Sequence, residues 1–78
     1  MMFLMEYNRS AGLLVTFRRF DDAAQARQAQ FALELDLHRK GIEHEVVLLE
    51  AESEAAIRRT HRRYFEDLPT LLNAIGTV

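Results

Sequence analysis

Residues 21–41, DDAAQARQAQFALELDLHRKG, constrain the fold of this chain most, because they have the signature of one long helix. Asp21 or Asp22 can cap the first turn of this helix. Gly41 can end it, because glycine readily adopts the left-handed conformation that closes a helix. The basic residues just before Gly41 suit the negative end of the helix dipole. The pattern therefore predicts a long helix with a clear start and a clear end.

This helix has apolar residues on two faces, because successive residues lie about 100° apart around a helix axis. The first stripe consists of small and aliphatic residues: Ala23, Ala26, Ala29, Leu33 and Leu37. The opposite stripe contains Ala24, Phe31 and Leu35, with Ala32 beside it. A surface helix of a small domain needs one apolar stripe to cover the core. The second stripe needs its own cover, since leaving Phe31 and Leu35 in water forgoes about 1.5–3 kcal/mol each.

Two partners could cover the second stripe: the C-terminal helices of the same chain, or another subunit. A chain of 78 residues has a marginal core, and without cysteine it has no disulfide to reinforce that core. We therefore favour a homodimer with Ala24, Phe31 and Leu35 in the interface. A twofold dimer could pack helix on helix or join sheet edges, whose backbone groups are otherwise unpaired.

The segments around the helix predict strands. Residues 3–7 alternate between two faces, and residues 13–20 are β-branched and aromatic. The turn-forming residues between them include Gly12, which can take a positive φ, so we expect a β-hairpin. Residues 42–50 predict a third strand. Its apolar half, Val46–Leu49, is typical of a strand covered on both faces and too apolar for an exposed edge.

The C-terminal part predicts two further helices. Ser53 can cap a helix that continues to about Phe65, and Pro69 marks the start of a short final helix that ends at Gly76. The predicted fold class is therefore α+β, with the order ββαβα and a single domain over residues 1–78. A three-stranded sheet is covered by the long helix and the C-terminal helices, and dimerisation completes the core.

The composition narrows the classes of function. A hydrophobic share of 49% and a charged share of 28% are those of a globular protein, not a disordered one. The net charge of −2 gives no general attraction to nucleic acid or to anionic membranes. No apolar run approaches the roughly 20 residues of a membrane span, and residues 1–8 do not resemble a signal peptide. We expect a soluble, cytoplasmic protein without a membrane partner.

The densest charge lies in residues 58–65, RRTHRRYF, whose arginines are Arg58, Arg59, Arg62 and Arg63. Guanidinium groups suit phosphate and carboxylate, and Tyr64 could stack on a base, so this segment is a candidate anion or nucleic-acid site. A simpler interpretation is a solvated helix face, because Glu54 precedes Arg58 at a favourable ion-pair spacing. Further carboxylates that could offset the charge are Glu43, Glu45 and Glu66. We favour the simpler interpretation; an acidic protein partner is a third alternative.

The histidines give weaker signals. His61 shares an apolar stripe with Ile57 and Tyr64, so His61 and Tyr64 are a candidate pocket for a small enzyme, although a hydrogen-bonded boundary residue is the commoner role. His44 alternates onto the face of its strand that also carries Ile42 and Val46. No pair of histidines has the spacing of a metal site, so we assign no metal, no cofactor and no catalytic residue.

These observations favour a small self-associating protein that acts by binding a protein or a small molecule. Nucleic-acid or anion binding through the arginines of residues 58–63 is the first alternative, and an enzyme using His61 and Tyr64 is the second. The sequence contains no motif that selects a substrate.

Overall fold

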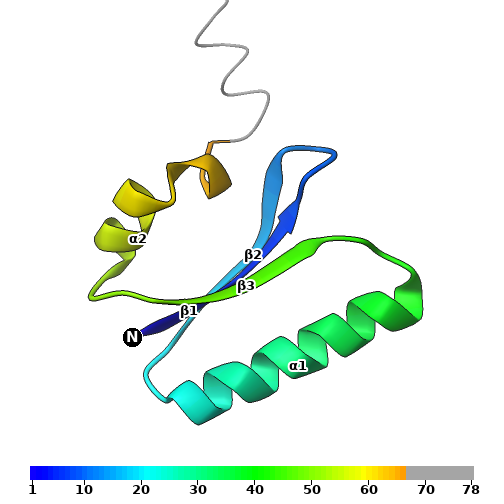
Figure 1. Cartoon of the computed structure of the whole chain (residues 1–78), viewed down its shortest axis with the longest axis horizontal. Coiled ribbons are helices and arrows are strands. Elements are labelled where there is room, and N and C mark those ends of the chain that lie inside the picture. The colour runs from blue at the N-terminus through cyan, green and yellow to red at the C-terminus, as the bar shows by residue number, and fades with distance from the viewer. Residues whose placement is uncertain (67–78) are drawn as a thin grey trace, which may run out of the picture.

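The computed structural model describes residues 1–66 and shows a small α+β domain with a three-stranded antiparallel sheet and two helices (Figure 1). The elements in chain order are β1 (Met2–Asn8), β2 (Leu13–Phe20), α1 (Ala23–Lys40), β3 (Glu45–Glu50), α2 (Glu54–Thr60) and the short 3-10 helix η1 (Arg62–Tyr64). The predicted hairpin, long helix and third strand are therefore confirmed. The predicted final helix around Pro69 lies outside the described residues.

The sheet has the order β2-β1-β3, with β1 in the centre and antiparallel to both neighbours. This position explains the composition of β1, whose residues 3–7 are all buried. On β2 the register shifts opposite Glu6 and Tyr7, which pair with Thr16 and Leu14. Val15 lies between these two partners without a pairing residue on β1, as in a β-bulge.

The third strand corrects one expectation. It starts at Glu45 and not at Ile42, and it is an outer strand of the described sheet although Val46–Leu49 looked too apolar for an edge. The reason is that both of its faces are covered, and all four residues of Val46–Leu49 are half-buried. A strand can thus be apolar on both faces and still lie at an edge, because face burial and edge pairing are separate constraints.

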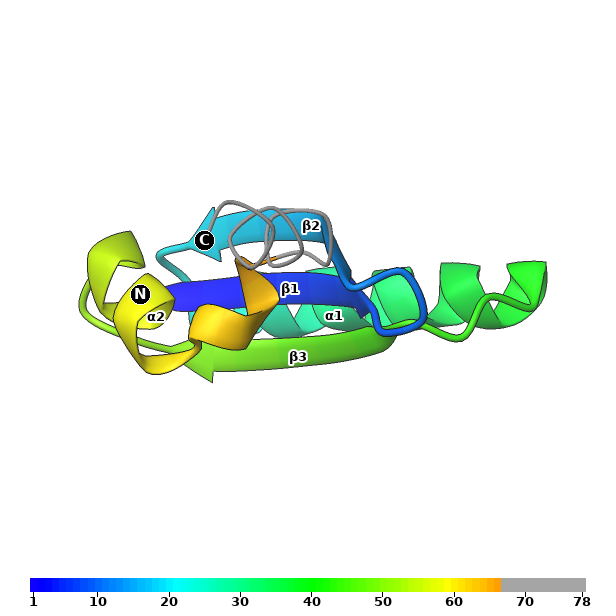
Figure 2. The same ribbon diagram turned by 90° about the horizontal axis from the view of Figure 1, so that it is seen from above.

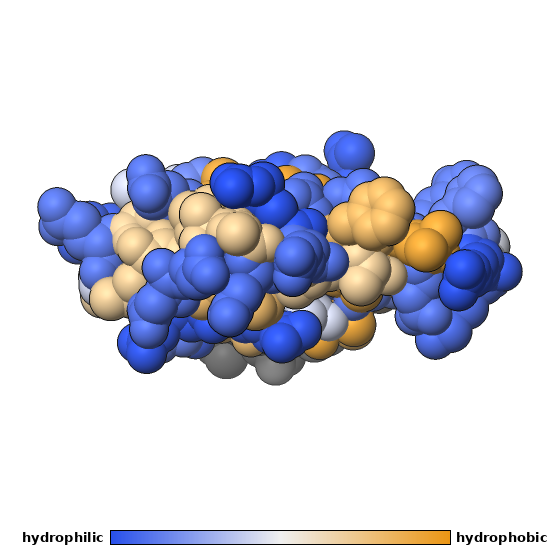
Figure 3. Space-filling view, turned by 90° about the horizontal axis from the view of Figure 1, so that it is seen from below, coloured by the Kyte–Doolittle hydropathy of each residue, from blue (hydrophilic) through white to orange (hydrophobic). Residues whose placement is uncertain are grey.

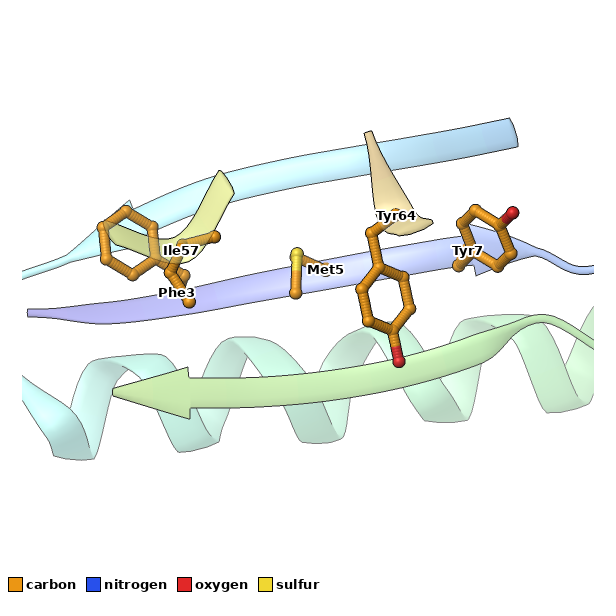
Figure 4. Packing of buried hydrophobic residues seen from close by; sticks show 5 residues of the cluster. All are labelled: Phe3, Met5, Tyr7, Ile57 and Tyr64. Carbon is orange, nitrogen blue, oxygen red and sulfur yellow. The ribbon is translucent and has the colours of Figure 1, made fainter. Parts of the chain in front are cut away.

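The domain has three layers, with α1 on one face of the sheet and α2 with η1 on the other (Figures 1 and 2). The side chains buried between the sheet and α2–η1 form the aromatic cluster: Phe3, Met5, Tyr7, Ile57 and Tyr64 (Figure 4). The Phe3 ring stacks on Phe17 at 5.5 Å between centroids, and Phe17 meets Phe65 edge-on at 5.3 Å. Tyr7 and Tyr64 also pack edge-on at 5.2 Å, so the favoured ring geometries recur across this layer.

Helix α1 begins and ends as its sequence predicts. The Asp22 side chain accepts a hydrogen bond from the Ala24 N–H at 2.9 Å, and Gly41 closes the helix with φ 68°. The first apolar stripe faces the sheet, where Ala26 and Leu37 are buried. Among the described residues, no helix combines the length and the apolar character that a membrane crossing requires.

The helix predicted from Ser53 to Phe65 is interrupted. Ser53 caps α2 as expected, accepting a hydrogen bond from the Ala56 N–H at 3.1 Å, but α2 ends at Thr60. His61, with φ −127° and ψ 49°, leaves the helical conformation, and η1 follows. Because of this break, Tyr64 packs against Tyr7 of the central strand instead of continuing the surface of α2.

Candidate functional site

The second apolar stripe of α1 points away from the sheet. Phe31 is 69% exposed and Leu35 is 37% exposed, while Ala24 is also exposed. Figure 3, which looks at the molecule from below, shows tan and orange side chains between blue ones on this face. The described C-terminal elements lie on the opposite face of the sheet, so α2 and η1 do not cover the stripe. We call Ala24, Phe31 and Leu35 the outer stripe.

The arginine segment is largely engaged with carboxylates of the same chain. Arg58 pairs with Glu54 at 3.5 Å, Arg62 with Glu66 at 3.1 Å and Arg63 with Glu45 at 3.4 Å. These are the carboxylates that the sequence suggested as offsets. The pairs are exposed and contribute little to stability each, at most about 1 kcal/mol. Anion or nucleic-acid binding by Arg58, Arg59, Arg62 and Arg63 remains a prediction, and a ligand would compete with three internal pairs.

His61 and Tyr64 lie near each other but use different partners. Their ring centroids are 6.3 Å apart, and the His61 Nδ1 atom lies 2.8 Å from the Thr60 hydroxyl. The Tyr64 hydroxyl donates to Glu45 Oε2 at 2.9 Å and accepts from Arg63 at 2.7 Å. Burial raises the pKa of Tyr64, and the hydrogen bond to Glu45 and its charge raise it further, whereas Arg63 opposes the shift. A raised pKa suits a structural phenol and not a proton donor at neutral pH.

The other face of the sheet contains a buried polar cluster that sequence reasoning missed. Glu6, on the central strand, is only 5% exposed. Its Oε1 atom accepts a hydrogen bond from the Thr16 hydroxyl at 2.7 Å, and its Oε2 atom lies 2.6 Å from His44 Nδ1. With Glu6 taken as an ionised carboxylate, which only accepts hydrogen bonds, we assign the proton of this pair to His44 Nδ1. We call Glu6, Thr16 and His44 the polar cluster.

His44 borders two surface hollows. The first, of about 340 Å³, is lined by Glu34, Leu37, His38, Ile42, His44 and Val46. The second, of about 580 Å³, is lined by Arg9, Ser10, Glu43, His44 and Glu45. His44 therefore lines both hollows, and its imidazole is held by the Glu6 carboxylate. Neither hollow is lined by His61 or Tyr64, the residues that the sequence offered as a pocket.

Two sequence signals could have indicated the polar cluster. Glu6 is the only charged residue in the apolar run of residues 1–7, and the predicted alternation already placed it opposite Phe3 and Met5. His44 lies 38 residues further along the chain, so its meeting with Glu6 depends on β3 pairing with β1. Within residues 1–66, no group of three or more His, Cys, Asp or Glu side chains could hold a metal ion.

Comparison of the chain with models of known protein families, with curated proteins and with solved structures found no match. Any function must therefore follow from the outer stripe, the polar cluster and the hollows themselves.

Proposed function

We propose that this protein is a binding module that works as a homodimer, joined through the outer stripe of α1. The observation that supports the proposal is the 69% exposure of Phe31, on the helix face opposite the one that packs on the sheet. An aromatic side chain left in water at this place forgoes about 1.5–3 kcal/mol of burial. A second copy offers the same stripe and can cover it.

The spacing of the stripe fits a helix pair. Residues that face outward along α1 are separated alternately by four and three positions: Ala24, Gln28, Phe31, Leu35 and His38. This alternation is the pattern of a coiled-coil seam. In an antiparallel pair about a twofold axis, the half of each seam that carries the larger side chains meets the half of the other copy's seam that carries the smaller ones. Leu35 then lies opposite Ala24 of the partner subunit, and Phe31 lies opposite Gln28 of the partner subunit.

The charges beside the seam fit the same arrangement. Arg27 and Glu34 lie on one edge of the seam, a helical heptad apart, and both are exposed. Antiparallel pairing brings equivalent edges together, so Arg27 of each copy meets Glu34 of the partner subunit. This places opposite charges together twice in a twofold dimer, and it makes Arg27 and Glu34 a direct test of the helix direction.

The expected dimer is weak. Covering Phe31 and Leu35 on both copies contributes at most about 6–12 kcal/mol, because the range of about 1.5–3 kcal/mol per side chain applies to full exposure and these two are 69% and 37% exposed. Association costs about 4–15 kcal/mol in lost translational and rotational freedom. The balance favours dissociation constants in the micromolar range or above, so the dimer should form and dissociate as concentration changes.

Sedimentation velocity over a range from low micromolar to near millimolar concentration tests the proposal. We expect the wild type to shift from monomer to dimer, and Phe31→Glu to remain a monomer throughout. Val15→Glu is the matched control, because Val15 is 53% exposed on the outer strand β2 and is not part of the outer stripe. A wild type that stays monomeric contradicts the proposal. So does loss of the dimer in Val15→Glu but not in Phe31→Glu, which would indicate pairing of sheet edges.

Charge exchange tests the helix direction. Arg27→Glu alone and Glu34→Arg alone should each weaken the dimer, since each creates two like-charge contacts. The double variant should restore it, because the opposite charges then meet again with their signs exchanged. If the double variant dimerises as weakly as the two single variants, the antiparallel arrangement is contradicted. The role of Phe31 is tested separately by Phe31→Glu.

A further inference from the structure

We propose that the hollow beside His44 binds a primary ammonium group carried on an aliphatic chain, either a free amine or a lysine side chain. The inference gives a ligand class to the proposed binding function. All residues of the hollow come from one chain, so the ligand site does not require the dimer.

The first support is the fixed orientation of His44. Its Nδ1–H donates to Glu6 at 2.6 Å, and Glu6 is itself held by the Thr16 hydroxyl at 2.7 Å. Within residues 1–66, no side-chain partner occupies His44 Nε2, and that atom is not among the buried polar atoms without a hydrogen bond. In the neutral imidazole, Nε2 is a hydrogen-bond acceptor that faces solvent. A ligand that meets it must donate a hydrogen bond.

The second support is the charge around the hollow. The Glu34 carboxylate lies in its wall, and the Glu6 carboxylate lies directly behind His44. On the other side of His44, the second hollow adds Glu43 and Arg9, together with Glu45, which is already paired with Arg63 at 3.4 Å. Within residues 1–66 Glu34 forms no ion pair, so its carboxylate is available to a cationic ligand and opposes an anionic one.

The third support is the apolar part of the wall. Leu37 from α1, Ile42 from the following loop and Val46 from β3 line the same hollow as Glu34 and His44. Ile42 is 39% exposed, so an aliphatic chain that covers it removes apolar surface from water. A volume of about 340 Å³ lies at the low end of the range for ligand sites, which suits a short chain and not a large cofactor.

A primary ammonium group matches these three features together. It has three N–H donors, of which one can bond to His44 Nε2 and another to Glu34, in a charge-assisted hydrogen bond. Its aliphatic chain can lie over Leu37, Ile42 and Val46. A bare metal ion fits less well, since no group of three or more metal-ligating side chains occurs within residues 1–66.

The test is an NMR titration of the full chain, labelled with nitrogen-15, at mildly alkaline pH. The probes are n-hexylamine, hexanoate and hexan-1-ol, which share a chain length and differ in the polar group. We expect n-hexylamine to shift the amide signals of Ile42, His44 and Val46 saturably. Hexanoate and hexan-1-ol should do so at least about tenfold more weakly, because they lack the charge-assisted hydrogen bonds. Equal or tighter binding of hexanoate overturns the proposal.

A lysine derivative separates the two sources of the ammonium group. Nα-acetyl-lysine methylamide carries the same group on a peptide unit. If it shifts the same signals as strongly as n-hexylamine, the site takes a lysine side chain of a protein; if only n-hexylamine does so, the site takes a free amine. Absence of saturable shifts with both compounds overturns the proposal.

Two variants of α1 make the test specific. Glu34→Gln should weaken n-hexylamine binding about tenfold, the usual effect of losing a charged hydrogen-bond partner. Asp36→Asn removes the same charge from the same helix outside the hollow and should have little effect. Equal weakening by both variants would show unspecific attraction and overturn the proposal. Both residues are exposed, so neither variant endangers the fold.

The dimer and the ligand site are judged separately. Glu34 also faces the proposed partner subunit, so Arg27→Gln is measured as well; it removes the other half of that ion pair and should not weaken n-hexylamine binding. Weakening by Arg27→Gln as strong as by Glu34→Gln overturns the single-chain site. A monomer in sedimentation that still binds n-hexylamine refutes the dimer alone. A dimer that binds hexanoate as tightly as it binds n-hexylamine refutes the ligand class alone.

Discussion

The two faces of the sheet differ in the side chains that they bury. Towards α2 and η1, the central strand presents Phe3, Met5 and Tyr7, which pack with Ile57 and Tyr64 in a closed layer of aromatic and aliphatic side chains. Towards α1, the same strand presents Leu4 and Glu6. There the buried side chains include a carboxylate, and the helix that covers them keeps a second apolar stripe in solvent.

We propose that this difference separates the face that stabilises the domain from the face that binds. A buried apolar side chain stabilises the fold wherever it packs well, so the face towards α2 needs no other explanation. A buried carboxylate costs desolvation energy, and its hydrogen bonds do little more than offset that cost. The polar cluster, the hollow beside His44 and the outer stripe all lie on the α1 side. We infer that the α2 side holds the domain together and that the α1 side meets its partners.

The largest expected effect is on the aromatic cluster. Phe3 has no exposed surface, so Phe3→Ala should lower the free energy of unfolding by about 3–5 kcal/mol. That is most of the stability of a domain this small, and the variant should be largely unfolded without ligand. Circular dichroism during urea denaturation measures the loss. Val15→Ala is the control on the same sheet and should change stability by less than about 0.5 kcal/mol. A folded, cooperative Phe3→Ala protein would contradict the assignment of stability to this face.

The next effect concerns the polar cluster. Glu6→Leu removes the shared acceptor and leaves the Thr16 hydroxyl and His44 Nδ1–H without it, which should cost about 1–3 kcal/mol. The triple variant Glu6→Leu, Thr16→Val and His44→Leu removes all three polar groups. Its free energy of unfolding should lie within about 1 kcal/mol of the wild-type value or above that value, because apolar replacements of buried polar groups are often neutral or stabilising. A triple variant as unstable as Glu6→Leu would show that the cluster stabilises the fold after all.

A smaller effect is expected at Tyr64, whose hydroxyl joins the aromatic cluster to Glu45 and Arg63. Tyr64→Phe loses the hydrogen bonds to Glu45 and Arg63 and should cost about 1–2 kcal/mol. The pKa of Tyr64 is raised by burial and by Glu45, so the folded state favours the neutral phenol. This contribution is fully present below about pH 10, the ordinary pKa of tyrosine, and is lost as pH rises through the folded pKa.

Urea denaturation at several alkaline pH values checks this sign. The wild type should lose stability above about pH 10 more steeply than Tyr64→Phe, because only the wild type carries this phenol. Parallel loss in both proteins would mean that other groups cause the alkaline destabilisation. The comparison also tests whether Glu45, whose Oε1 atom is buried without a hydrogen-bond partner in the described residues, depends on the Tyr64 hydroxyl.

The elements that the sequence predicted well are those fixed by neighbouring residues. Asp22 and Gly41 bound α1 because capping depends on side chains and φ angles at the helix ends themselves. The ion pair between Glu54 and Arg58 followed from helical spacing in the same way. The break at His61 was missed, since Tyr64 gains a tertiary contact with Tyr7 that the helix wheel does not contain.

The candidate site depends on contacts that sequence spacing could not supply. Glu6 and His44 meet only because β1 lies between β2 and β3, and strand order was not predictable from the chain. The outer stripe, in contrast, followed from the wheel of α1, and Phe31 and Leu35 are exposed as that wheel requires. The periodicity of α1 thus located the outer stripe, whereas the contact between Glu6 and His44 could be seen only in the folded structure.

The smallest expected effect on the monomer, and the sharpest distinction between the two faces, comes from Phe31→Ser. Because Phe31 is 69% exposed, its loss should change the free energy of unfolding by less than about 0.5 kcal/mol at low protein concentration, where the wild type is monomeric. At high concentration the wild type should gain stability by mass action, since dimerisation favours the folded state. Phe31→Ser should not gain it. Thermal unfolding at several concentrations measures both curves: a midpoint that rises with concentration only in the wild type places association on the outer stripe. If the midpoint does not change with concentration in either protein, the outer stripe does not mediate self-association. A large loss of stability in Phe31→Ser at low concentration would mean that the α1 face also stabilises the monomer.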